Sequence, residues 1–85
     1  MLKASITSDQ IRAARALLRW SAAGLASKSG VGLATIKRFE VMQGVPRGNT
    51  ATLDAIRSAL ESNGIEFVGT PDDRPGVRLS NACEA

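Results

Sequence analysis

The side chains of this sequence that could do chemistry are mostly cations. Eight of them stand within residues 1–48: Lys3, Arg12, Arg15, Arg19, Lys28, Lys37, Arg38 and Arg47. Arginine presents a planar set of donors and lysine a mobile point charge, and both bind phosphate groups. The pattern predicts contact with a polyanion, although the same charges are also compatible with an ordinary solvated surface.

Residue inventory excludes several kinds of catalysis. The sequence has no His, no Tyr and one Cys, so it offers neither a His-based nucleophile system nor a Cys/His zinc site. Its carboxylates show no pairing suited to acid and base catalysis. With 85 residues, the chain forms one small domain with a modest core. We therefore expect no enzymatic activity and no cofactor.

Charge is divided unevenly along the chain. Residues 1–48 carry eight basic and two acidic side chains, a net charge of +6, whereas residues 49–85 carry three basic and six acidic ones, a net charge of −3. The basic half suits a nucleic-acid partner. Cys83 is a lone thiol and favours a reducing compartment. No apolar run approaches the roughly 20 residues of a membrane span, so we expect a cytoplasmic protein without membrane contact.

Four helices are predicted before residue 64. Thr7 and Gln10 form a capping box that begins a helix over about residues 8–19. Trp20 follows that helix; it could stack on bases, but packing in a corner of the core is the better interpretation. Two further helices are expected over residues 22–29 and 33–42.

The stretch between these two helices has the residue types of a helix-turn-helix. Ala26 is small where two crossing helices would touch, and Gly30 can adopt positive φ at the turn. Val31 would fill the angle between the helices, while Ile36 returns the second helix to the core. The residues left facing outward are Leu33, Ala34, Lys37 and Arg38.

The fourth helix begins at Asn49 or Thr50 and ends at Gly64, which suits a left-handed C-terminal position. Beyond it, residues 65–68 and 77–79 favour strands, separated by a long loop over residues 69–76. This hairpin either covers the first and fourth helices or pairs with another chain.

The expected fold is thus mainly α, with four helices and a C-terminal β-hairpin. We assign residues 1–64 to a helix-turn-helix domain and 65–80 to the hairpin, packed on or extending that domain. Residues 81–85 are expected to form a flexible tail.

The chain resembles the Cro/C1-type (XRE) family of helix-turn-helix regulators over about residues 6–64. The matching positions are Leu25, Ala26, Gly30, Val31, Ile36, Arg38 and Glu40. The resemblance implies a four-helix Cro/C1-type domain whose third helix enters the major groove of operator DNA. It also implies a structural ion pair between Arg15 and Glu40. DNA reading would require a dimer on half-sites about one helical turn apart, and the C-terminal hairpin is a candidate dimer contact.

Carried over by position, one set of residues would face the groove and another the DNA backbone. The groove-facing set is Leu33, Ala34, Lys37 and Arg38, and Thr35 completes the DNA-binding set. The backbone set is Lys28, Arg47 and Asn49. Leu33 and Ala34 suit thymine methyl groups, and Arg38 suits guanine. The Thr35 hydroxyl either holds a phosphate or folds back on its own helix.

Two departures from the family pattern leave the function open. Ala22, Ala23 and Gly24 stand where the family places Gln and acidic residues, and Gly32 stands where Ser or Thr is common. Backbone amides at a helix start can still bind phosphate, which keeps operator DNA as the expected partner. Alternatively, the bare surface docks on another transcriptional regulator, for example a quorum-sensing or mobile-element activator, and the chain is an antiactivator or adaptor.

Overall fold

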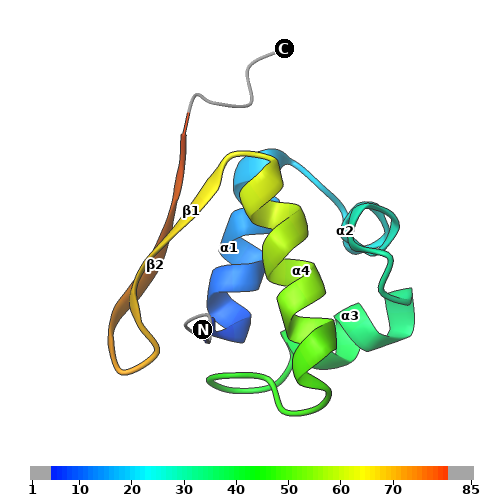
Figure 1. Cartoon of the computed structure of the whole chain (residues 1–85), viewed down its shortest axis with the longest axis horizontal. Helices are drawn as coiled ribbons and strands as arrows, with labels where there is room; N and C mark the ends of the chain where they lie inside the picture. Colours follow the sequence, from blue (N-terminus) through cyan, green and yellow to red (C-terminus); the bar gives the residue numbers. More distant parts are fainter. Residues whose placement is uncertain (1–4, 81–85) are drawn as a thin grey trace.

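The computed structural model describes residues 5–80 as four helices followed by an antiparallel hairpin (Figure 1). The elements are α1 (Ser8–Leu18), α2 (Ala22–Ser29), α3 (Leu33–Glu40), α4 (Thr50–Ser62), β1 (Ile65–Thr70) and β2 (Asp73–Leu79). Figure 1 shows α1 and α4 between the hairpin on one side and α2 with α3 on the other. The predicted layout of four helices and a C-terminal hairpin is confirmed. The expected tail at 81–85, with Cys83, lies outside the described residues.

The start of α1 confirms the predicted capping box. The Thr7 side chain accepts from the Gln10 backbone N–H at 3.1 Å, and the Gln10 side chain accepts from the Thr7 backbone N–H at 2.8 Å. The helix ends at Leu18, one residue earlier than expected. Arg19 adopts the left-handed conformation, with φ of 59°, and this conformation cannot continue a right-handed helix.

The connection between α2 and α3 has the predicted geometry. Gly30 ends α2 with φ of 76°, and Ile36 is completely buried. Ala26 and Val31 are partly buried and pack against the core, as expected for residues at the contact of two crossing helices. Gly32 begins α3 without any side-chain cap, so the first amides of this helix lack that partner.

α3 is shorter than predicted, because it ends at Glu40 rather than at Met42. The side chains of α1 bind the carbonyls at this end: Arg12 donates to the Glu40 carbonyl and Ser8 to the Met42 carbonyl. The Ser8 backbone N–H also donates to the Gly44 carbonyl at 2.9 Å. These contacts replace the hydrogen bonds that another helical turn would have made.

A single apolar core lies between the helices and the inner face of the hairpin. Asn49 caps α4 by accepting from the Ala51 N–H at 2.8 Å, and Gly64 follows its end with φ of 100°. The buried apolar residues are Ile6, Ile11, Ala14, Leu25, Ile36, Phe39, Ile56, Leu60 and Ile65. No helix in the described part of the chain has the length and apolarity to cross a membrane.

The long loop predicted at 69–76 is wrong, because the strands continue through most of it. Thr70 pairs with Asp73, so the reversal takes only two residues. The register shifts between Val68 and Thr70, where Gly69 has φ of 74° and Arg74 has φ of 52°. A bulge of this kind absorbs the extra residue and lets the ladder resume.

The hairpin is attached to the helices through Gln10, which is 3% exposed. Its side-chain amide donates to the Gly76 carbonyl at 2.9 Å and to the Val68 carbonyl at 3.3 Å. Gly76 and Val68 are partners across the two strands, so one side chain of α1 binds both. With β2 on α1 and β1 on α4, the hairpin covers these two helices.

Candidate nucleic-acid interface

α3 presents one continuous exposed face. Four of the outward residues that we expected, Leu33, Ala34, Lys37 and Arg38, are exposed, and Val41 joins them at the end of the helix. At 3.6 residues per turn these five positions span an arc of about 140°. The buried side chains of α3, including Ile36 and Phe39, lie outside this arc. We call the five exposed residues the α3 face.

Sequence reasoning did not include Val41, and it left two roles open for the Thr35 hydroxyl. Val41 is 79% exposed, the largest value among the exposed large hydrophobic residues described. Its place four residues after Lys37 and eight after Leu33 was the available signal, because the helix expected over residues 33–42 already contained it. Thr35 is half-buried and lies outside the arc of the α3 face.

The cations of the described chain fall into two groups according to their partners. Five of them make no ion pair within residues 5–80, and all five lie between positions 19 and 47. They are Arg19, Lys28, Lys37, Arg38 and Arg47. This segment contains α2, α3 and the connections before α2 and after α3. Because these five side chains have no ion pair, carboxylates do not neutralise their positive charge.

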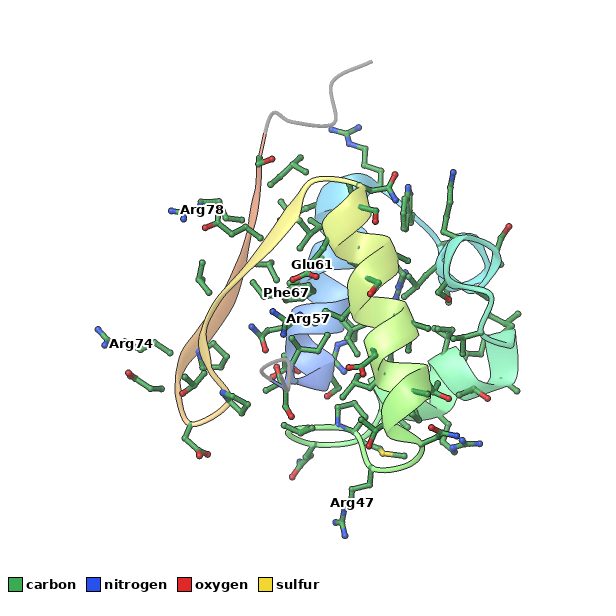
Figure 2. All side chains as sticks on the ribbon, in the orientation of Figure 1. Arg47, Arg57, Glu61, Phe67, Arg74 and Arg78 are labelled. Atoms are coloured by element: carbon green, nitrogen blue, oxygen red, sulfur yellow. The ribbon has the colours of Figure 1, made fainter. Side chains whose placement is uncertain are left out.

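The basic residues of α4 and the hairpin are all paired. Arg57 contacts Glu61 at 3.0 Å and lies 5.1 Å from the centre of the Phe67 ring. Figure 2 shows these three side chains between α4 and the hairpin, with Arg74 and Arg78 on the strands. The last two are held by carboxylates as well, each at 2.8 Å. This side of the molecule therefore has little free positive charge.

All three residues expected to contact the DNA backbone are exposed, but two of them also make contacts within the protein. The Lys28 ammonium lies 5.8 Å from the centre of the Trp20 ring, a cation–π contact. The Asn49 side-chain oxygen caps α4, so only its amide hydrogens remain for another partner. Arg47 extends away from the body of the protein, on the loop before α4 (Figure 2). Trp20 itself is half-buried and packs against the core, as predicted.

The first turn of α2 lacks polar side chains, as its sequence implies. Ser21 caps this helix by accepting from the Gly24 N–H at 3.0 Å, and Ala23 is exposed. No polar side chain is available at Ala22, Ala23 or Gly24. Any contact of this helix start with phosphate would therefore use backbone amides.

An ion pair fixes α3 against α1, as the resemblance implied. Arg15 donates to both carboxylate oxygens of Glu40, from Nε at 2.9 Å and from Nη2 at 2.8 Å. A third donor, Nη1, binds the Trp20 carbonyl at 3.1 Å, just before α2. Hydrogen bonding to Glu40 raises the pKa of the Arg15 guanidinium above its ordinary value. The pair thus connects the end of α3 with the entry to α2.

The described residues contain no cluster of three or more acidic, His or Cys side chains that could hold a metal ion. Neither the family models nor the curated proteins that were compared with this chain match it.

Proposed function

We propose that this chain is a cytoplasmic transcriptional regulator that binds operator DNA through α3, in the manner of a Cro/C1-type helix-turn-helix protein. One observation carries the proposal. All five cations without an ion pair in residues 5–80 lie between positions 19 and 47, around α2 and α3. Cations that are free of carboxylates can neutralise phosphates and release counterions, which is the main source of affinity for DNA.

Each part of the surface has a distinct role in this proposal. Arg38 donates to the two acceptors of a guanine edge, and Lys37 reaches a base or a phosphate. Lys28 and Arg47 bind the DNA backbone and set the position of the domain without reading sequence. Arg15 contacts no DNA and acts by orienting α3.

The hairpin serves as the dimer contact in this scheme. It lies at one end of the longest axis of the molecule, with α2 and α3 at the other (Figure 1). Two hairpins can therefore pair across a two-fold axis that runs along this direction and leave both α3 helices free for DNA.

The test begins with selection of binding sites from a random duplex library, followed by affinity measurement on the selected duplex. Arg38→Ala should weaken specific binding by about 1–3 kcal/mol. Arg57→Ala is the control, because Arg57 is paired with Glu61 on α4, outside both α3 and the strands of the hairpin. Equal affinities of the two variants and the natural chain would remove Arg38 from the reading surface.

A second candidate function rests on the apolar part of the same face. Leu33 is 38% exposed and Val41 79% exposed, so the α3 face presents two large apolar side chains to solvent. A partner protein would bury these side chains together with the bare start of α2. In this case the chain is an antiactivator or adaptor that occupies another transcriptional regulator.

Capture from host extract, with and without nuclease, separates the two functions. A regulatory protein that stays bound after nuclease treatment supports the antiactivator, and selective recovery of DNA supports the operator-binding protein. For a protein partner, Leu33→Asp should abolish capture while the variant stays folded. Leu17→Asp is the control, since Leu17 is similarly exposed, at 42%, but lies on α1.

A further inference from the structure

The α3 face combines methyl-bearing side chains with donors and contains no acceptor. Lys37 and Arg38 carry only N–H donors, and Leu33, Ala34 and Val41 carry only hydrocarbon. Reading the exocyclic amino groups of adenine or cytosine requires an acceptor, whereas guanine presents two neighbouring acceptors, N7 and O6, that match a pair of donors. The face therefore has complementary chemistry for two base-pair features, the acceptors of guanine and the C5-methyl group of thymine.

The large apolar side chains stand at the two ends of this face. Leu33 begins α3 and Val41 follows its last residue, eight positions later. At 1.5 Å per residue they are about 12 Å apart along the helix. This length corresponds to three or four base pairs at about 3.4 Å each. Arg38 lies between them, next to Lys37.

We propose that α3 reads its half-site largely through thymine methyl groups, which Leu33 and Val41 contact on either side of a guanine bound by Arg38. The inference rests on the proposed DNA-binding function and specifies its ligand. The exposure of Val41, at 79%, leaves most of this side chain available to a base edge. The free cations around α2 and α3 supply the charge complementarity with the DNA backbone.

Uracil substitution tests this proposal with one group removed at a time, because uracil differs from thymine only by the C5-methyl group. Sites are selected from a random duplex library, and single thymines in the selected duplex are then replaced by uracil. Each replacement at a methyl-reading position should weaken binding about four-fold, the factor that corresponds to about 0.8 kcal/mol for one buried methyl group.

Variants then assign each methyl group to a side chain. Val41→Ala should remove the effect of uracil at one position, and Leu33→Ala at the other. Leu17→Ala, on α1, should preserve both effects. Val41 is mostly exposed, so its truncation should leave the circular dichroism spectrum and the thermal midpoint nearly unchanged.

The possible failures are distinguishable. If the chain selects a duplex that binds equally well with uracil throughout, methyl reading is refuted and DNA binding stands. If no duplex is bound at low salt, the proposed DNA-binding function fails, and the methyl inference fails with it. If uracil weakens binding equally in the natural chain and in both truncated variants, Leu33 and Val41 are not the readers.

Discussion

The ion pair between Arg15 and Glu40 allows a quantitative prediction, because its two partners are buried to different extents. The Glu40 side chain is 9% exposed and that of Arg15 is 23% exposed. Arg15→Met leaves a nearly buried carboxylate without its cation and removes the donor to the Trp20 carbonyl. Breaking a buried pair in this way costs about 3–5 kcal/mol.

The opposite change should cost less. Glu40→Gln leaves the Arg15 guanidinium partly in contact with water and still bound to the Trp20 carbonyl, and the glutamine oxygen can accept one hydrogen bond. The expected cost is that of one hydrogen bond to a charged group, about 1.5–3 kcal/mol. Replacing both residues, as Arg15→Met with Glu40→Leu, should recover most of the stability, since no charge is then left buried.

Urea unfolding followed by fluorescence is the assay, because Trp20 is the sole tryptophan of the sequence. The fluorescence of Trp20 reports on the connection between α1 and α2, where Arg15 binds the Trp20 carbonyl. The reasoning is refuted if Glu40→Gln lowers the free energy of unfolding as much as Arg15→Met does. It is also refuted if the double variant is no more stable than Arg15→Met alone. Small domains have unfolding free energies near the lower end of about 5–15 kcal/mol, so the first variant should be only marginally folded.

Two further predictions concern the turns and the hairpin. Gly69→Ala places a Cβ 2.2 Å from the Arg74 carbonyl oxygen, whereas Gly30→Ala, at nearly the same φ, meets nothing within 4 Å. Urea unfolding should show a loss of about 1–2 kcal/mol for Gly30→Ala, the cost of left-handed backbone alone, and a larger loss for Gly69→Ala; equal losses would contradict the clash. The hydrogen bond from Arg78 lowers the pKa of Glu66, so this pair stabilises the hairpin above the ordinary pKa of glutamate and ceases to do so as pH falls through the lowered value. A carboxyl titration by NMR should therefore move to higher pH in Arg78→Gln, and an unchanged midpoint would show that Arg78 is not the cause.

Most of the helical structure follows from local sequence. Three local signals act within one or two helical turns, and the structure confirms the position of each. They are the capping box of Thr7 with Gln10 and the left-handed glycines Gly30 and Gly64. Helix ends were less predictable, since Arg19 adopts a left-handed conformation that its residue type disfavours. The end of α3 depends on side chains of α1 that are about 30 residues away along the chain, such as Arg12.

The candidate site divides in the same way. The residue types identified the outward positions of α3, because a helical repeat fixes which positions share a face. Spacing also places Val41 on this face, four residues after Lys37, but spacing alone could not show that Val41 is 79% exposed. Nor could it show which arginines are paired, because ion pairs such as Arg78 with Glu66 join positions that only the hairpin register brings together.

The amino-acid sequence by itself thus determined the order of the helices, the tight turn at Gly30 and the basic character of the segment that contains α2 and α3. These properties depend on caps, backbone conformation and charge, which act over a few residues. The tertiary structure decided how the hairpin is held, through the bonds of Gln10 to both strands. It also decided which cations remain free for a partner, because a charge is neutralised only by groups that folding brings within contact distance.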